Sequence, residues 1–359
     1  CTTQNDTPHQ MQQHIITENA TIIEALRRLN SLSGGVMTLA VTDSDRRMTG
    51  TLTDGDIRRG LLDGASLTDT VDTIMHRNFR AITPHNHTTD QITTIREFRS
   101  QGIRLIPRLD QNGRITDLID TTRTRSQLPL TAIIMAGGKG ERLRPATLTC
   151  PKPLLQVAGK PIIDYNTTLL RANGITDITV TVNYLAEQIE QHFSHENLGV
   201  KCIREPQPLG TIGAASLIPH RPGHHTLVMN SDLLTTISLE DMWLRHTSQQ
   251  ADITIAAIPY NLSVPYAILT TDNLRVTGLE EKPSYSYYAN AGIYIIANHL
   301  LQTLPTDRRT DATDLISQAI ADRRKVTYYP ISGTWIDIGS PADYRHACEL
   351  MQHHRSMNA

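Results

Sequence analysis

The chain has 359 residues, too many for one small hydrophobic core, which predicts two or three domains. Its 34 basic and 36 acidic side chains nearly balance, so no broad positive field indicates nucleic acid as a partner. The four cysteines lie far apart without Cys-x-x-Cys spacing, which argues against a zinc site or a disulfide framework and is typical of a reducing cytosol. No apolar run approaches the ~20 residues that span a bilayer, and no signal-peptide pattern opens the chain, so we expect a cytoplasmic protein without a membrane segment.

The N-terminal third shows an imperfect duplication. Residues 16–29 predict a strand end followed by an amphipathic helix, and residues 82–98 repeat this pattern. Each helix leads to a short apolar strand, at residues 38–41 and 104–106, then to a polar turn and a further apolar run. A repeated unit of this size predicts two modules packed on each other.

The first copy ends in GTLTDGDIRR, residues 50–59. This segment resembles the end of a cystathionine-β-synthase (CBS) module, a family that often binds adenine nucleotides. The resemblance implies that the hydroxyl of Thr53 and the carboxylate of Asp56 face a ribose, since a carboxylate accepts hydrogen bonds from hydroxyl groups. We therefore expect residues 9–124 to form a tandem CBS domain that regulates the protein or mediates dimerisation.

The second copy departs from this pattern, with Asp117, Asp120 and Arg123 at the corresponding positions. Two carboxylates there would repel a phosphate-bearing ligand unless the arginine offsets them. We expect at most one adenine-nucleotide site, and a purely dimerising pair remains the alternative.

From residue 131 onward, apolar strands alternate with amphipathic helices. This order predicts an α/β domain with a doubly wound, mainly parallel, Rossmann-like sheet that binds ligands at the carboxyl ends of its strands. The expected strands are residues 132–135, 178–182, 226–229, 253–258 and 292–296. The expected helices are residues 162–172, 187–193, 213–218 and 239–247.

A glycine-rich turn, Gly137-Gly138-Lys139-Gly140, follows the first of these strands. Glycines let backbone N–H groups approach phosphate oxygens, and Arg142 and Lys152 supply positive charge for a polyphosphate. A P-loop would close on Gly-Lys-Ser/Thr, where Glu141-Arg142 stands. A dinucleotide fingerprint needs a third glycine, where Leu143 stands.

The segment MAGGKGERLRPATLTCPKPLLQVAGKPIID, residues 135–164, resembles the N-terminal signature of the sugar-1-phosphate nucleotidyltransferases. Further elements that resemble motifs of this family follow in the family's order: Glu205–Ala214, Met229–Asp232, Glu280–Pro283, Asn290–Tyr294 and Trp335–Pro341. The resemblance implies a nucleotidyltransferase domain over residues 130–352.

The implied reaction joins a nucleoside triphosphate to a sugar 1-phosphate. A phosphate oxygen of the sugar attacks the α-phosphorus and pyrophosphate leaves, so positioning and charge neutralisation supply the catalysis. By resemblance, Asp232 and Asp337 hold Mg²⁺, a hard cation that prefers carboxylates. The implied catalytic residues are Arg142 at the β- and γ-phosphates, Lys152 near the α-phosphate, Lys282 at the sugar phosphate, and the metal-binding Asp232 and Asp337.

The same resemblance implies the remaining binding residues. The nucleotide-binding residues are Ala136, Gly137, Gly138, Gly140, Glu205, Leu209, Gly210 and Thr211. The sugar-binding residues are Ala267, Glu281 and Asn290. Two positions depart from the family pattern: Ser231 replaces a glycine before the metal aspartate, and Ala267 replaces a glycine whose N–H faces the sugar.

The loop Leu209-Gly210-Thr211 resembles that of guanylyltransferases. Together with the CBS pair, it resembles the glucosamine-1-phosphate guanylyltransferase type of bacterial legionaminic acid biosynthesis. We predict GTP and a hexose or aminohexose 1-phosphate as substrates, and a homo-oligomer, since both families often self-associate. A mannose-1-phosphate guanylyltransferase, a glucose-1-phosphate thymidylyl- or uridylyltransferase and a catalytically silent nucleotide sensor remain alternatives.

Overall fold

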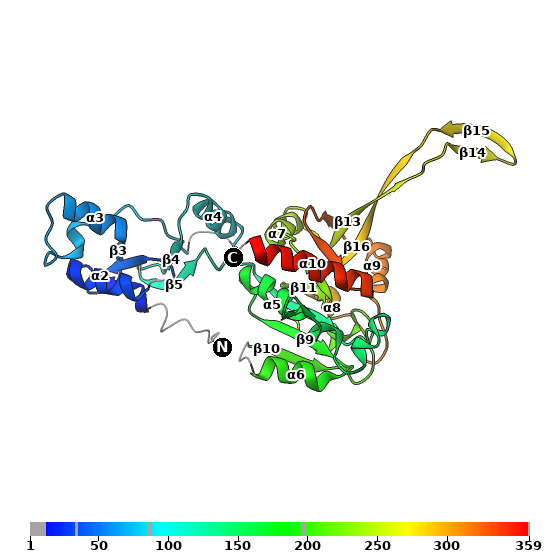
Figure 1. Ribbon diagram of the computed structural model, residues 1–359, viewed down its shortest axis with the longest axis horizontal. Helices are drawn as coiled ribbons and strands as arrows, with labels where there is room; N and C mark the ends of the chain where they lie inside the picture. Colours follow the sequence, from blue (N-terminus) through cyan, green and yellow to red (C-terminus); the bar gives the residue numbers. More distant parts are fainter. Residues whose placement is uncertain (1–11, 33–34, 85–87, 196–198, 358–359) are drawn as a thin grey trace. The chain divides into compact units, whose positions relative to one another are not determined.

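The computed structural model describes residues 12–32, 35–84, 88–195 and 199–357. The chain divides into two compact units, Cys1–Gln127 and Leu128–Ala359, and each is described by itself (Figure 1). Residues 9–11 of the expected first domain lie outside the described residues. Over the described ranges, no helix is both long and apolar enough to cross a membrane.

The first unit opens with a three-stranded sheet in the order β1-β2-β3. β1 is parallel to β2, and β2 is antiparallel to β3. Its elements are β1 (Ile15–Thr17), α2 (Ile22–Ser31), β2 (Thr38–Thr42), β3 (Met48–Thr53), α3 (Asp54–Leu62) and the 3-10 helix η1 (Val71–Thr73). The apolar sides of α2 and the sheet form one core, which includes Ile22, Leu29, Leu39 and Leu52.

The second half of this unit repeats the order helix, strand, strand. Its elements are α4 (Thr88–Ser100), β4 (Leu105–Leu109) and β5 (Ile115–Asp120). β4 and β5 are antiparallel, and a parallel bridge joins Ile82 to Arg108 as β1 joins β2 in the first half. A separate core of Ile82, Ile95, Phe98, Ile106 and Ile119 shows that this half buries its own apolar face.

The second unit is built on a seven-stranded sheet in the order β10-β9-β6-β11-β16-β13-β17. Four of its neighbouring strand pairs are parallel, and β16 is antiparallel to both of its neighbours. The predicted mainly parallel α/β fold is therefore confirmed. The strands are β6 (Leu130–Ala136), β9 (Ile178–Val182), β10 (Val200–Arg204), β11 (His225–Asn230), β13 (Ile253–Ser263), β16 (Ser284–Ala297) and β17 (Val326–Pro330).

Helices cover this sheet, which explains why its central strands are apolar without alternation (Figure 1). All five residues of β9 are buried. The helices are α5 (Ile162–Ala172), α6 (Ala186–His195), α7 (Leu239–Ser248), α8 (Asn298–Leu301), α9 (Ala312–Ala321) and α10 (Pro341–Met357). Short two-stranded sheets add β7 (Gln156–Val157) with β8 (Lys160–Pro161), and β12 (Leu233–Thr235) with β18 (Trp335–Asp337).

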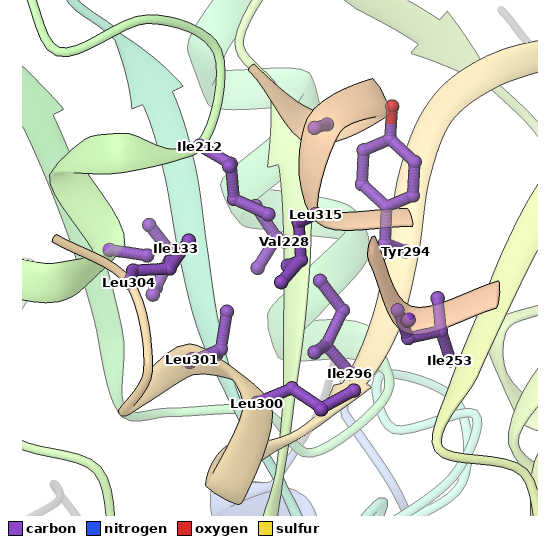
Figure 2. Packing of buried hydrophobic residues seen from close by; sticks show 13 residues of the cluster. Ile133, Ile212, Val228, Ile253, Tyr294, Ile296, Leu300, Leu301, Leu304 and Leu315 are labelled. Carbon is purple, nitrogen blue, oxygen red and sulfur yellow. The ribbon is translucent and has the colours of Figure 1, made fainter. Parts of the chain in front are cut away.

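One face of the sheet packs against α8 and α9 through branched aliphatic side chains. Figure 2 shows Ile133, Val228 and Ile296, from three neighbouring strands, gathered with Leu301 and Leu315 from the two helices. Close packing of such side chains fixes the positions of the strand ends that surround the candidate site.

The segment expected as a helix at residues 213–218 is instead the 3-10 helix η5 (Gly213–Leu217). Its hydrogen bonds join residues three apart, from Ala215 N–H to the carbonyl of Ile212 and from Ile218 N–H to the carbonyl of Ala215, while Thr310 accepts the N–H groups of Ile212 and Gly213.

β13 and β16 continue beyond the sheet as a two-stranded ribbon, which ends in the hairpin β14 (Ile268–Asp272) and β15 (Arg275–Glu280). We call residues 258–290 the arm. Figure 1 shows the arm extending away from the sheet of the second unit.

Candidate active site

The glycine-rich turn directly follows the carboxyl end of β6. A Cβ atom at Gly137 would overlap Oε1 of Glu205, and one at Gly138 would meet no heavy atom within 4 Å. Gly140 has a φ of 60°, a conformation that glycine adopts without a steric penalty, and its carbonyl accepts a hydrogen bond from Thr147 Oγ1 at 2.8 Å. The turn is therefore packed against protein on one side and open on the other.

The open side faces a cleft of about 520 Å³. Ten of the residues predicted from sequence line it: Ala136, Gly137, Gly138, Gly140, Arg142, Lys152, Glu205, Gly210, Thr211 and Asp232. They come from the glycine-rich turn, the short helices after it, the loop after β10 and the end of β11. The fold thus gathers the predicted polyphosphate and base loops at the carboxyl ends of parallel strands, where α/β sheets bind ligands.

Charged groups of opposite sign meet at the floor of the cleft. The ammonium group of Lys152 forms an ion pair with Asp232 and lies 4.0 Å from Oδ1 of Asp337. Lys152 is buried, and Asp337 is placed by the pairing of β18 with β12. The guanidinium of Arg142 lies beside Gly339, where an added Cβ would be 3.2 Å from it, and its charge acts on Asp337.

The two carboxylates fit a hard divalent cation. Oδ1 of Asp232 and Oδ1 of Asp337 are both buried and accept no hydrogen bond within the described structure. Burial raises the pKa of the Asp337 carboxyl, and the carboxylate of Asp232 raises it further, while Lys152 and Arg142 oppose the rise. Two unsatisfied carboxylate oxygens are the protein ligands that Mg²⁺ uses beside substrate phosphates and water. Among the described residues, no group of three or more His, Cys, Asp or Glu side chains could hold a metal ion.

Buried contacts with Glu205 fix the loop after β10. Glu205 is buried and accepts a hydrogen bond from the backbone N–H of Leu209 at 3.0 Å. Burial raises the pKa of Glu205, and this hydrogen bond opposes the rise. Leu209 is itself fully buried, so it anchors the loop through its side chain and does not line the cleft.

The other side of this loop is bound by the segment before α9. Gly210 has a φ of 88°, and a Cβ there would lie 2.5 Å from the carbonyl oxygen of Thr310. Thr211 donates its backbone N–H to Asp311 Oδ1 at 2.9 Å and accepts at Oγ1 from the backbone N–H of Ala312 at 2.8 Å. The loop therefore meets a ligand with a fixed backbone.

The segment before α9 also contributes to the cleft a positively charged side chain, Arg309, which was not predicted from the sequence. Arg309 lines the cleft, and its Nη2 lies 3.1 Å from Oδ2 of Asp311. In the sequence it is one of two adjacent arginines without a motif, and only the contact between its segment and the loop after β10 distinguishes it from Arg308. Asn230 and Ser231, at the end of β11, also line the cleft.

The residues predicted to bind the sugar are not brought to the cleft. Ala267, Glu281 and Lys282 lie on the arm, the latter two exposed, and none of the three lines the cleft. Asn290 lies at the base of the arm, where its Oδ1 accepts the backbone N–H of Gly292 at 2.9 Å. A Cβ at Gly292 would lie 2.5 Å from Nδ2 of Asn230, so this base adjoins the cleft. The sugar contacts of these residues stay predictions.

In the first unit, Thr53 and Asp56 form hydrogen bonds with each other, which occupy the groups expected to face a ligand. Asp56 Oδ2 accepts from the N–H of Thr53 at 2.8 Å and from its hydroxyl at 2.6 Å, in a capping box at the start of α3. Asp56 Oδ1 is paired with Arg59 at 2.6 Å. A hollow of about 510 Å³ beside α3 includes Asp56 in its lining, but not Thr53. Its other lining residues are Arg59, Gly60, Asp63, Ala65, Asp69, Thr73, Ile74 and Met75.

Known proteins resemble both units. A family model described as Nucleotidyl transferase matches residues 131–354, and one described as CBS domain matches residues 12–63. A probable mannose-1-phosphate guanylyltransferase 2 of Arabidopsis thaliana is 33% identical over 228 residues, which are 59% of this chain and 62% of that protein. A putative mannose-1-phosphate guanyltransferase of Sulfolobus acidocaldarius is 31% identical over 221 residues, 60% of this chain and 61% of that protein. The chain thus spans about three fifths of the length of these relatives.

Solved structures also align with the chain. HddC from Yersinia pseudotuberculosis is 25% identical with a TM-score of 0.48, covering 62% of this chain and 99% of that chain. A putative glucose-1-phosphate thymidylyltransferase from Bacillus anthracis is 24% identical with a TM-score of 0.47, covering 62% of this chain and 94% of that chain. Because the first family model covers well over half of the residues, the chain belongs to the nucleotidyl transferase family, with a CBS domain at its N-terminus.

Proposed function

We propose that this protein transfers a guanylyl group from GTP to a sugar 1-phosphate and releases pyrophosphate. The observation that carries the proposal is the cleft in which an open glycine-rich turn, the cations Arg142, Lys152 and Arg309, and the carboxylate of Asp232 converge. A sugar phosphate is already an anion, so no side chain has to activate it as a nucleophile. Charge neutralisation and in-line positioning are what the reaction requires.

Each group has a role that follows from its place. The open backbone of Gly138 would donate hydrogen bonds to phosphate oxygens of the triphosphate. Arg142 would neutralise the leaving β- and γ-phosphates, and Lys152, buried beside Asp232, the region of the α-phosphate. Mg²⁺, bound by Asp232 and Asp337, would supply further neutralisation of phosphate charge. Lys152 would then exchange its carboxylate partner for a phosphate oxygen, so its positive charge stays compensated throughout.

Guanine as the base is supported by the relatives, which are named as mannose-1-phosphate guanylyltransferases. Gly210 and Thr211 line the cleft and would meet the base, while the hydrogen bonds of Leu209 to Glu205 and of Thr211 to Asp311 hold them in fixed positions. For the sugar we propose a hexose or hexosamine 1-phosphate, with mannose 1-phosphate and glucosamine 1-phosphate as the first to be tried. The sugar-binding roles of Ala267, Glu281, Lys282 and Asn290 belong to this proposal.

The test is pyrophosphate release from the whole chain with Mg²⁺, using GTP, dTTP and UTP, each with mannose, glucosamine and glucose 1-phosphate. We expect release with GTP and one of the first two sugars. Release with dTTP or UTP but not with GTP would contradict the choice of base. Nucleotide binding without turnover in any combination would instead favour a catalytically silent sensor.

We further propose that the first unit is a regulatory module that binds an adenine nucleotide at Asp56, and that the protein works in the cytoplasm. The hollow beside α3 has room for such a ligand, but its lining includes Asp63 and Asp69 as well as Asp56. The single guanidinium of Arg59 would have to offset these carboxylates. Calorimetry of the whole chain with AMP and ATP, with Asp56→Asn as the control, tests the site, and absence of heat with both ligands would remove it.

A further inference from the structure

The arm carries most of the exposed apolar surface of the second unit. Ten of the thirteen exposed large apolar side chains described in this unit lie on the arm. They are Tyr260, Leu262, Tyr266, Ile268, Leu269, Leu274, Val276, Leu279, Tyr287 and Tyr288. A concentration of this kind on a projecting element marks an interaction surface.

The two faces of the hairpin at the tip of the arm differ in polarity. Leu269 is paired with Leu279, and Thr271 with Val276; paired residues share a face, as do alternate residues of one strand. Leu269, Val276 and Leu279 therefore lie on one face, where they are 52 to 64% exposed. The opposite face carries the pair Asp272 and Arg275, and Glu280 with its partner Ile268, so it is charged but includes one of the ten apolar side chains.

The stem of the arm repeats this division. Tyr260 is paired with Tyr287, and Leu262 with Tyr285, so these four side chains share one face. The opposite face is mainly polar: Ser286 donates a hydrogen bond to Asn261 at 2.7 Å, and the hydroxyls of Ser263 and Ser284 lie 3.2 Å apart. Tyr288 also lies on this face, where its ring contacts that of Tyr328 in β17. Both segments thus have the pattern of a half-buried sheet, although nothing described in the second unit covers the apolar side.

An isolated two-stranded ribbon is marginally stable in water and needs a packing partner. Large apolar side chains bury roughly 150–200 Å² each, so the half-exposed residues of the two apolar faces leave on the order of 500 Å² uncovered. That is a large part of the ~800 Å² that each partner contributes to a standard protein interface. The fully exposed Leu274, in the turn of the hairpin, adds to this area.

We infer that the apolar faces of the stem and of the tip of the arm pack against the same faces of a second copy of this chain. In a two-fold contact, the same surface patch of both copies meets. The apolar positions at the tip carry no charge, so two copies of this patch can pack together without repulsion between like charges. The arm as a whole has Asp272, Glu280 and Glu281 against Arg275 and Lys282. This slight acidic excess does not favour an anionic lipid surface, which attracts basic segments.

Cross-linking of the whole chain tests the contact. In Val276→Cys the new thiol lies on the apolar face, and in Asp272→Cys it lies on the polar face of the same hairpin with the same native cysteines. A short bis-maleimide is expected to give a covalent dimer of Val276→Cys well above the level of Asp272→Cys. Adding Leu269→Asp should abolish this product, and adding Thr270→Asp, on the polar face, should not.

Sedimentation measures the strength of the same contact. Leu269→Asp is expected to raise the dissociation constant of self-association about tenfold, since it places a charge in the apolar contact, and Thr270→Asp should leave it unchanged. A covalent dimer that persists with Leu269→Asp would overturn the inference. So would no excess of dimer for Val276→Cys, the result expected if the arm covers its own cleft or binds another partner. A wild-type chain that sediments as a monomer throughout the micromolar range would also overturn it.

Discussion

The ammonium group of Lys152 forms an ion pair with the carboxylate of Asp232, 80 positions further along the chain. Lys152 belongs to the 3-10 helix η4 (Lys152–Leu154) and is buried, and Asp232 follows the end of β11. Burying one of these charges without the other would be costly, so each stabilises the other in the absence of ligands. The pair therefore keeps a cation and the carboxylate that we propose as a metal ligand in the same place.

The first prediction concerns Asp232→Asn. The amide keeps the size of the side chain but removes the charge that would bind Mg²⁺ beside Asp337. We expect turnover to fall by about 100-fold or more, as is typical when one electrostatic group of a catalytic site is removed. The Mg²⁺ concentration for half-maximal activity should rise. Both are measured by pyrophosphate release in a magnesium titration.

Asp177→Asn is the matched control, because Asp177 is paired with Lys201 on the surface at 3.2 Å and lies outside the cleft. It should keep wild-type turnover and magnesium dependence. Near-normal activity of Asp232→Asn would refute the role assigned to this carboxylate.

The second prediction compares two alanines in the glycine-rich turn. Gly137→Ala places a methyl group against the buried Glu205 and should lower the free energy of unfolding by about 1–3 kcal/mol. Gly138→Ala meets no protein atom and should change it by less than about 0.5 kcal/mol. Gly138→Ala should nevertheless raise the KM for the triphosphate about tenfold, if phosphate oxygens approach its N–H. Urea titration and steady-state kinetics measure the two effects; a wild-type KM would argue against the turn as the triphosphate site.

Much of the fold follows from the sequence because its signals are local. β9 and α5 have the predicted bounds, since a buried parallel strand and an amphipathic helix show their periodicity in a few residues. The glycine-rich turn, Lys152 and Asp232 could also be named in advance, because each belongs to a compact motif. These motifs follow one another in the order known from the nucleotidyltransferase family, and this order predicted that they share one cleft.

The features that could not be predicted from the sequence depend on contacts between distant segments. Arg309 lines the cleft because Thr310 binds the loop around Leu209, about a hundred positions earlier, and no local pattern marks that contact. Gly137 is crowded and Gly138 is open because Glu205 and Asn183, which lie far from them in the sequence, pack against Gly137 alone. Most of the arm lies between the expected strands at residues 253–258 and 292–296 and was not itself expected, because its pairing extends beyond the sheet and its exposed apolar face has no cover in the second unit.

The third prediction tests the cation that the sequence did not indicate. Arg309→Gln should lower kcat/KM by about 10- to 100-fold, the effect of losing one charge-assisted hydrogen bond to phosphate. Arg308→Gln is the matched control, since Arg308 is adjacent and is not among the residues that line the cleft. It should change kcat/KM by less than about twofold. Separate titrations of GTP and of the sugar phosphate identify which substrate Arg309 serves; equal effects of the two variants would contradict the assignment.

The fourth prediction rests on the buried His246 and its half-buried partner His225 in the second unit. His246 is 1% exposed; its Nδ1 lies 2.8 Å from Thr254 Oγ1 and its Nε2 lies 2.9 Å from His225 Nδ1. Burial, with a smaller effect of His225, lowers the pKa of His246 to about 4, and burial lowers the pKa of His225 as well. The ring of Trp243 stacks on His246, with the centroids 5.7 Å apart.

Because the pKa of His246 is lower in the folded than in the unfolded chain, the unfolded state binds more protons between pH 6.5 and about 4. The second unit should therefore have its full stability above pH 6.5 and lose up to roughly 3 kcal/mol as the pH falls to about 4. Urea unfolding followed by tryptophan emission measures this, since both tryptophans, Trp243 and Trp335, lie in this unit. His246→Gln should lower stability at pH 7 and flatten the pH dependence, while His346→Gln, exposed on α10, should keep the wild-type slope. An unchanged slope in His246→Gln would show that other groups govern the acid sensitivity of this unit.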